Sequence, residues 1–257
     1  MHFKRFAVIA DIHGNSDALA YVLADIDALC IETVINLGDH LSGPLAARET
    51  LDMLMAREMI SIRGNHDRWL VEKPVAEMGP SDRVAFEQLE AQHLAWLCDL
   101  PASLSLADGK IFICHGTPTS DTTYWLETVT ATGDVVLRGR DEIEAEAEDI
   151  AASLILCGHT HTPRVVRLSD GRQIINPGSV GCPGYDDDQP VPHSVQTGTP
   201  NASYAVIEDS SLGWQVTFRS IPYDTTRMAS LAGQAGRAEW AHAIRSGWLR
   251  LTPDCKS

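Results

Sequence analysis

The first 62 residues alternate between two hydrophobic periods, and this alternation limits the folds that the chain can adopt. Short apolar runs are typical of strands buried on both faces, whereas apolar residues three and four positions apart are typical of helices packed on a sheet. The order strand, helix, strand, helix, strand predicts parallel strands with right-handed helical crossovers. The expected strands lie at 6–10, 33–37 and 59–62, and the expected helices lie at 19–29, after a cap at Asn15 or Ser16, and at 47–55, in a helix that Pro44 opens.

The sequence after residue 62 predicts a helix first and then mainly strands. One helix starts at Ser81-Asp82 and carries its apolar face as far as Leu97. The pairs Asp108-Gly109 and Asp170-Gly171 have the turn chemistry of hairpins. Residues 183–201 are rich in Pro, Gly and Asp and predict an exposed loop. The expected strands are 104–106, 110–114, 154–157, 165–168 and 173–175, followed by an antiparallel pair at 203–208 and 214–221.

Neither an internal repeat nor a linker divides the chain into separate cores. We therefore expect one domain over residues 1–257, with two packed sheets and flanking helices. The C-terminal extension from Thr225 is amphipathic, and we expect it to pack on its own domain, with a contact in a homo-oligomer as the alternative. Its apolar residues are Met228, Leu231, Trp240, Ile244 and Trp248.

Five of the expected strands are followed by the same kinds of residue, because Asp, Asn or His stands beside a glycine at each strand end. Each short motif alone is common, but in such a sheet the carboxyl ends of the strands line one ligand crevice. These residue types bind divalent metal ions, and glycine lets a backbone and a metal approach closely. The sequence therefore predicts a shared metal site formed by Asp11-Ile12-His13, Gly38-Asp39, Gly64-Asn65-His66-Asp67, His115-Gly116 and Gly158-His159-Thr160-His161.

The chain has 35 acidic and 20 basic side chains, which give a formal net charge of −15. This charge argues against nucleic acid or an anionic membrane as the partner, whereas bound metal ions still allow a small phosphorylated substrate. No apolar run reaches the roughly 18 residues of a membrane span, and no signal peptide is recognisable. None of the six cysteines forms a Cys-x-x-Cys pair, so we expect reduced thiols in a cytoplasmic protein.

The five motifs, in this order, resemble those of the calcineurin-like metallophosphoesterase superfamily. The resemblance spans residues 5–220, and Asn176-Pro177-Gly178-Ser179-Val180-Gly181 is similar to a turn of its small bacterial phosphodiesterase-like branch. It implies an α/β fold, a four-layer α/β/β/α sandwich of two mixed β-sheets flanked by helices. It also implies a dinuclear centre of two divalent metal ions. We expect manganese, and the ligand types also suit Fe, Zn, Ni or Co.

Transferred residue by residue, the resemblance implies two ligand sets that share one carboxylate. Asp39 would bridge both ions, and His66 would lie beside the substrate phosphate, where it stabilises charge or protonates the leaving oxygen. The remaining metal ligands would be Asp11, His13 and His161 for one ion and Asn65, His115 and His159 for the other.

Several residues around these motifs have two alternative interpretations. Asp67 either orients the His66 ring or is a carboxylate favoured at the start of a helix. His40 lies behind the ligands or faces the substrate, or else it is a surface histidine. Arg63 either reaches the phosphate or only flanks a strand. The candidate substrate-binding residues are thus Asn65, His66, His40 and Arg63.

The resemblance implies hydrolysis of a small phosphodiester or phosphomonoester through attack by a metal-bridging hydroxide. The alternative is a nucleotide pyrophosphohydrolase or a dinucleoside polyphosphate hydrolase, whose substrate is a nucleotide. In the superfamily that the chain resembles, protein Ser/Thr phosphatases and symmetric dinucleoside tetraphosphatases carry an arginine shortly after this Gly-Asp pair. Residues 40–44 contain no arginine, which argues against both. A non-catalytic scaffold is the hypothesis from another class, but all seven ligand positions are present and favour an enzyme.

Overall fold

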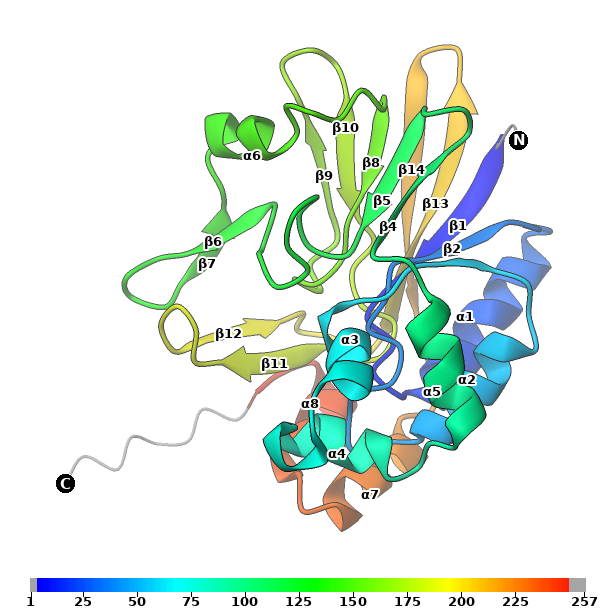
Figure 1. The fold of residues 1–257 in the computed structure, drawn as a ribbon, viewed down its shortest axis with the longest axis vertical. Coiled ribbons are helices and arrows are strands. Elements are labelled where there is room, and N and C mark those ends of the chain that lie inside the picture. Colours follow the sequence, from blue (N-terminus) through cyan, green and yellow to red (C-terminus); the bar gives the residue numbers. More distant parts are fainter. Residues whose placement is uncertain (1–3, 250–257) are drawn as a thin grey trace.

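The computed structural model describes residues 4–249, in which two five-stranded sheets pack face to face (Figure 1). The first sheet has the order β14-β13-β1-β2-β3, with β1, β2 and β3 parallel and with β13 antiparallel to both of its neighbours. The strands are β1 (Arg5–Ile9), β2 (Val34–Asn36), β3 (Ile60–Ser61), β13 (Ala202–Ser210) and β14 (Gly213–Ile221). The predicted parallel order of the first three strands and the predicted antiparallel pair are both confirmed.

The second sheet has the order β4-β5-β8-β10-β9, in which the three central strands are parallel and the two edge strands are antiparallel. Its strands are β4 (Ser103–Leu106), β5 (Ile111–Cys114), β8 (Leu154–Leu156), β9 (Arg164–Arg167) and β10 (Gln173–Asn176). Both predicted hairpin turns join antiparallel neighbours, and Ala107, Asp108 and Gly109 all take the left-handed backbone conformation that such a turn requires.

Alternating side chains of the strands build two cores, one on each side of the first sheet. In β1, Phe6 and Val8 face the second sheet, whereas Ala7 and Ile9 face the helices. Full burial of such a side chain stabilises the fold by about 1.5–3 kcal/mol. The core between the sheets contains Phe6, Val8, Ala10, Ile35, Leu37, Ile62, Ile111, Ile113, Leu154, Leu156, Ile175, Ala205 and Ile207.

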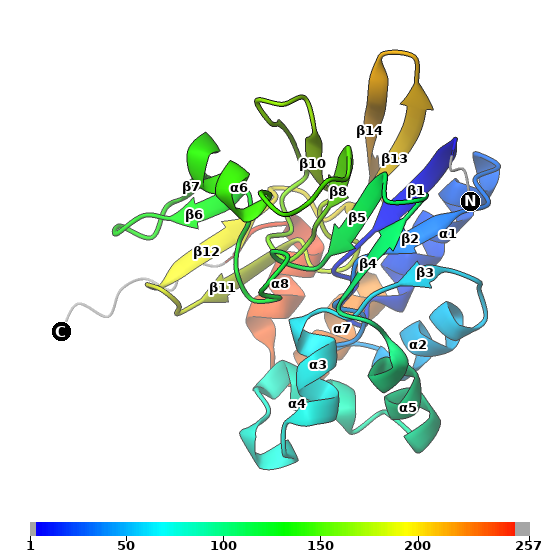
Figure 2. The same cartoon turned by 45° about the horizontal axis from the view of Figure 1, so that its top comes forward.

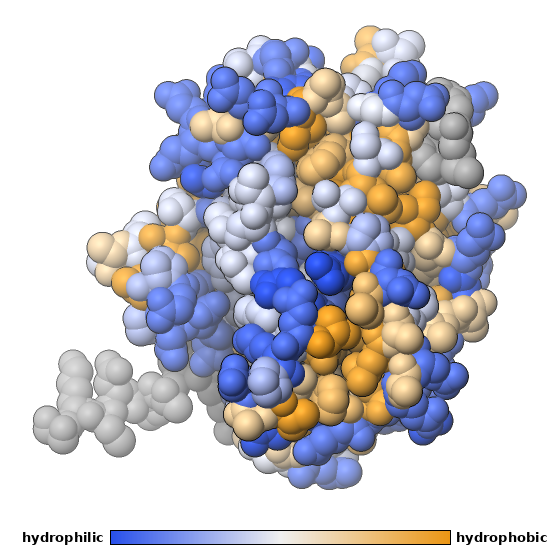
Figure 3. Space-filling model, in the orientation of Figure 1, coloured by the Kyte–Doolittle hydropathy of each residue, from blue (hydrophilic) through white to orange (hydrophobic). Residues whose placement is uncertain are grey.

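Helices cover the outer faces of both sheets and complete the predicted α/β/β/α layers (Figures 1 and 2). The helices α1 (Ser16–Ala28), α2 (Ala47–Met55), α3 (Asn65–Glu72), α4 (Pro80–Phe86) and α5 (Ala91–Asp99) lie on the side of the first sheet, and α6 (Arg140–Glu146) lies by the second. A short 3₁₀ turn, η1 (Val75–Glu77), connects α3 to α4. Figure 3 shows hydrophobic residues at the surface over α3 and α5. Val71 of α3 and Trp96 of α5 are partly buried and extend the helix-side core.

Three predicted elements differ from the structure. The single helix predicted from Ser81 is two helices, because Gln88 donates to Leu45 O and the Glu90 N–H donates to His93, and these contacts replace continued helical hydrogen bonds. The helix predicted to open at Pro44 begins at Ala47, since the Ala46 N–H is held by Gly14 O.

The predicted loop at 183–201 contains a hairpin of β11 (Gly184–Asp187) and β12 (His193–Gln196). A second hairpin, β6 (Glu127–Val129) with β7 (Val135–Leu137), was also not predicted, and β12 contacts β7. We call these two hairpins together the accessory lobe. Strands of only three or four residues are too short to show a clear hydrophobic alternation.

The C-terminal extension forms α7 (Thr226–Gln234) and α8 (Ala238–Ser246), which pack on Leu45 and Ala46 of the same chain. No helix among residues 4–249 combines the length and hydrophobicity that crossing a bilayer requires. The five cysteines in this range are free thiols, and Cys255 lies outside the described residues.

Candidate metal centre

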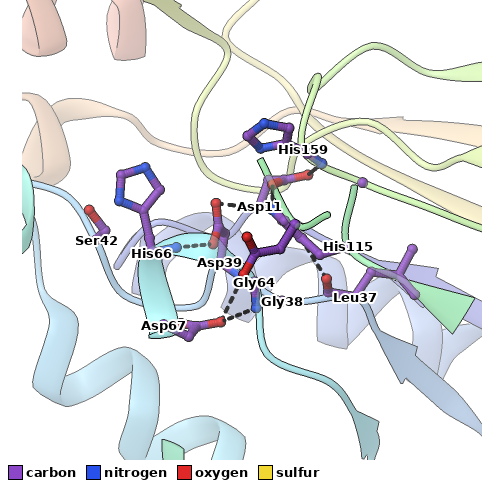
Figure 4. A network of polar contacts seen from close by, with 12 residues as sticks. Asp11, Leu37, Gly38, Asp39, Ser42, Gly64, His66, Asp67, His115 and His159 are labelled. Carbon is purple, nitrogen blue, oxygen red and sulfur yellow. Dashed lines mark hydrogen bonds and ion pairs between the residues drawn. The ribbon is translucent and has the colours of Figure 1, made fainter. Parts of the chain in front are cut away.

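The five strand-end motifs meet at one edge of the two sheets, as their positions predicted. They place two groups of side chains in which one potential ligand atom from each residue lies within 4.8 Å of those of the others. The first group is Asp11, His13 and His161, and the second is Asp39, His115 and His159. Each group combines residues that follow strands of the first sheet with residues that follow strands of the second. Figure 4 shows Asp11 and Asp39 side by side, with His115, His159 and His66 around them.

In their neutral form, three of these histidines (His13, His115 and His161) present a lone pair on Nε2 to the site. Their Nδ1 atoms lie 2.7–2.9 Å from the carbonyl oxygens of Ser42, Leu37 and Cys182. A carbonyl only accepts, so each Nδ1 carries the hydrogen and each Nε2 of a neutral ring is an acceptor. The Nε2 atoms of His13 and His161 nevertheless face each other at 3.2 Å. Two facing acceptors need a proton or a cation between them.

The buried polar atoms around this point also lack partners. Asp11 Oδ1, Asn65 Oδ1 and His115 Nε2 are buried without a hydrogen bond among the described residues. His115 Nε2 lies 3.2 Å from Asp39 Oδ2, and His161 Nε2 lies 3.5 Å from Asp11 Oδ1. Unpartnered buried polar atoms are costly and rare in native proteins. Imidazole nitrogens and carboxyl or amide oxygens suit divalent transition metals, so the donor set fits two metal ions.

The protonation of the metal-free site follows from burial and from these carboxylates. Burial opposes a charged imidazole, but Asp39 outweighs it and raises the pKa of His115 to about 10. Burial, together with the charge of His161, lowers the pKa of His13 to about 4. Burial, together with His115, likewise lowers the pKa of His159 to about 4. Burial also opposes a charged His161, but Asp11 outweighs it and raises the pKa of that ring above its ordinary value. Protons on His115 and His161 therefore occupy positions that a cation would take, and metal binding would release them.

The backbone of the site is strained. Five of the eight non-glycine residues with positive φ in residues 4–249 belong to the two groups, with φ between 51° and 70°. A left-handed conformation costs a residue with a side chain roughly 1–2 kcal/mol, and such residues cluster at functional sites. The five are Asp11, His13, Asp39, His159 and His161.

Two glycines allow the chain to pass close to Asp39. A Cβ at Gly64 would lie 2.2 Å from Asp39 Oδ1, and a Cβ at Gly38, where φ is +99°, would lie 2.3 Å from Gly64 N. A side chain at Gly64 would therefore displace the central carboxylate, and one at Gly38 would displace the Gly64 backbone. The turn at 176–181 supports the neighbouring loop, because the Ser179 hydroxyl and the Gly181 N–H both donate to Asp11 O.

His66 is the second residue of α3, and its ring contacts a carboxylate that was not predicted from the sequence as its partner. Its Nδ1 lies 2.7 Å from Asp82 Oδ1, and the Ser42 hydroxyl donates to the same oxygen at 2.6 Å. Burial lowers the pKa of His66, but Asp39 and Asp82 outweigh it and raise the pKa above its ordinary value. Asp82 lies on α4, which does not directly follow a strand, so the strand-end pattern could not predict its role.

Asp67 does not orient His66. Its carboxylate accepts from the N–H groups of Gly64, Asp39 and His40 at 2.8–3.0 Å, and it lies 2.7 Å from Nδ1 of His40. The interpretation as a carboxylate at the start of a helix is therefore correct, and the interpretation as a partner of the His66 ring is wrong.

His40 and Arg63 each contact an acidic side chain outside the two groups. His40 is fully buried between Asp67 and Trp96, so the surface interpretation is wrong and direct contact with a substrate does not fit its burial. The guanidinium of Arg63 lies 3.7 Å from Glu72, the last residue of α3. Since α3 rises about 1.5 Å per residue, this position is at the opposite end of the helix from Asn65.

Comparisons with known proteins agree with this geometry. Residues 5–198 match the model of the calcineurin-like phosphoesterase superfamily domain. A metallophosphoesterase from Sphaerobacter thermophilus is 26% identical, with a TM-score of 0.71 over 96% of this chain and 100% of that one. The hypothetical protein PH1004 from Pyrococcus horikoshii OT3 has the same fold, with 20% identity and a TM-score of 0.72 over 96% and 99% of the two chains.

A relative of similar length is known by sequence. The uncharacterized protein MJ0912 from Methanocaldococcus jannaschii is 23% identical over 248 residues, which cover 91% of this chain and 94% of that protein. The family match covers all five motifs that meet at the metal site. The chain therefore belongs to the calcineurin-like phosphoesterase superfamily and is a metal-dependent phosphoric ester hydrolase.

Proposed function

We propose that the chain hydrolyses a small phosphodiester or phosphomonoester at a dinuclear centre. The observation that carries this proposal is that two neighbouring Asp/His groups each bring three potential ligand atoms together, with the buried atoms Asp11 Oδ1 and His115 Nε2 left without a hydrogen bond among the described residues. In this proposal Asp11, His13 and His161 bind one ion, and Asn65, His115 and His159 bind the other. Asp39 bridges them, which agrees with its place between His13 at 4.0 Å and His115 at 3.2 Å.

Two divalent cations held there would polarise the phosphoryl oxygens and make the attacking water more acidic. His66 acts on the leaving group. Its Nδ1–H donates to Asp82, so in the charged ring the Nε2–H is free to donate to the leaving oxygen. The ring of Trp69 lies 4.7 Å from His66 and restricts its rotation. The backbone N–H of His66 donates to Asp39 Oδ1, which ties the acid to the bridging carboxylate.

The function is tested with the purified protein and added Mn²⁺ on bis-p-nitrophenyl phosphate, phosphomonoesters and nucleotides. We expect at least one ester to be hydrolysed. Hydrolysis of the nucleotides in preference to the simple esters would favour the pyrophosphohydrolase alternative. Silence on every substrate with each of Mn, Fe, Zn, Ni and Co would contradict the proposal.

Exhaustive chelation should abolish the activity, and Mn²⁺ added back should restore it, because the ligands must hold the metal for the chemistry to occur. The measurement is turnover beside metal content by elemental analysis. Full turnover in protein shown to be free of metal would exclude the two-metal mechanism.

Replacement of Asp82 by Asn should lower kcat by roughly 10-fold to 100-fold, a part of the factor that a positioned general acid contributes. The carboxylate both orients the ring and favours its charged form, so the pKa of His66 should fall and the basic limb of the pH–kcat profile should move to lower pH. Metal content should not change. Glu87→Gln, an exposed acidic position beside the end of α4, is the matched control. An unchanged profile with normal kcat would show that Asp82 has no such role.

A further inference from the structure

Three of the four histidines in the two groups are held by the same kind of hydrogen bond, and His159 lacks it. His13, His115 and His161 each donate Nδ1–H to a backbone carbonyl. Neither ring nitrogen of His159 has a hydrogen-bond partner within residues 4–249, and only its backbone N–H donates, to Asp11. A histidine that binds metal is normally fixed by a hydrogen bond at its other nitrogen. The protein holds the His159 ring by other means.

The ring of Tyr124 packs against the ring of His159. Its centroid lies 5.1 Å from the His159 centroid at an interplanar angle of 65°, the edge-to-face arrangement that aromatic pairs favour. The His115 ring lies 5.2 Å from the same ring. Contact with aromatic rings therefore limits the rotation of His159.

The hydroxyl of Tyr124 is itself held by two side chains of the accessory lobe. It lies 2.6 Å from the Tyr185 hydroxyl and 3.0 Å from His193 Nε2. His193 Nδ1 lies 2.9 Å from Val191 O, so in the neutral ring Nδ1 carries the hydrogen and Nε2 accepts from Tyr124. The Tyr185 hydroxyl then has two acceptors, the Tyr124 oxygen at 2.6 Å and the backbone carbonyl oxygen of His159 at 3.5 Å. Every hydrogen of this chain of contacts has an acceptor.

A second contact fixes the loop that carries Tyr124. Asp121 accepts two hydrogen bonds from Arg68 of α3, at 2.7 and 2.9 Å. This two-point pairing is the strong form of an ion pair. The loop is thus held between the helix of His66 and the β11–β12 hairpin.

We propose that Tyr124, held by Tyr185 and His193, is a positioning residue for His159 and through it for the metal bound at Asp39, His115 and His159. This inference rests on the proposed function only in that both groups bind metal. The site formed by Asp11, His13 and His161 should not depend on Tyr124. The Tyr185 ring centroid lies 4.6 Å from that of His161, but His161 is held by its own hydrogen bond to Cys182 O.

The test is calorimetric titration of the metal-free protein with Mn²⁺, which reports the affinity of each site without reference to catalysis. His159→Gln identifies the site that contains His159. Tyr124→Leu should weaken that same site by about 10-fold to 100-fold, the usual cost of losing a group that orients a ligand. Tyr124→Phe keeps the ring and loses the hydroxyl contacts, so its loss should be smaller but measurable. Tyr204→Phe, which removes a tyrosine hydroxyl bonded to Asp25 elsewhere, should leave both sites unchanged.

A second readout needs no metal. Imidazole NMR signals of His159 should be broadened in metal-free Tyr124→Leu and unaffected in Tyr204→Phe. Equal weakening of both sites, or unchanged affinity in both Tyr124 variants, would overturn the inference. If Tyr124→Leu fails to fold, the Mn²⁺ affinities of Tyr124→Phe and Tyr204→Phe are compared instead, and a loss at the His159 site in Tyr124→Phe alone supports the inference. Metal binding with no hydrolysis would count against the proposed function alone, whereas hydrolysis with unaltered affinities would count against this inference alone.

Discussion

Replacement of Asp39 by Asn should remove at least one metal ion and lower kcat by more than about 10³-fold, which corresponds to roughly 4 kcal/mol of transition-state stabilisation. Asp39 is 1% exposed, lies 3.2 Å from His115 Nε2 and accepts the backbone N–H of His66. An amide of the same shape keeps the packing around Gly64 but carries no charge. Two cations would then repel each other with less compensation.

The measurement for Asp39→Asn is metal content per chain together with kcat on the best substrate. Asp186→Asn, at an exposed carboxylate of β11, controls for the loss of one negative charge from an acidic protein. Two bound ions and near-normal turnover in Asp39→Asn would show that this carboxylate does not bridge the metals.

Replacement of His66 by Gln should leave both metals bound and lower kcat by roughly 10²-fold to 10⁴-fold, the range for a positioned general acid. The loss should be smaller for an ester with a good leaving group such as p-nitrophenol, because protonating that oxygen gains little. The measurement is kcat for a good and a poor leaving group beside metal stoichiometry.

The comparison variant for His66 is His159→Gln, which should lose metal first and activity as a consequence. A loss of equal size for both leaving groups in His66→Gln would make His66 a charge stabiliser and not an acid. Loss of metal from His66→Gln would instead make it a ligand.

The convergence of the five motifs could be predicted because it depends on strand order alone. Parallel strands end at the same edge, so residues directly after β1, β2 and β3 must be neighbours, and the same holds for those after β5 and β8. The apolar runs of these strands are short, continuous and bounded by glycine, which makes the register of the ligands clear from the sequence.

The groups that orient the site residues could not be predicted in the same way. Asp82 lies in a helix 16 positions after His66, and neither its burial nor its partner is marked by any local pattern. Tyr124, Tyr185 and His193 come from a loop and a hairpin whose short polar strands carry little periodic signal. Their contacts depend on how the accessory lobe packs, which only the tertiary structure determines.

Both groups of ligands combine the two sheets, since Asp11 and His13 follow β1 and Asp39 follows β2, whereas His115 and the two histidines at 159 and 161 follow β5 and β8. Each bound ion would therefore act as a cross-link between the halves of the sandwich. An unfolded chain offers no such arrangement, so binding shifts the folding equilibrium by mass action, by about 2.7 kcal/mol per site at a free ion concentration 100 times the dissociation constant. The folding stability of the protein would thus depend on the availability of free metal ions around it.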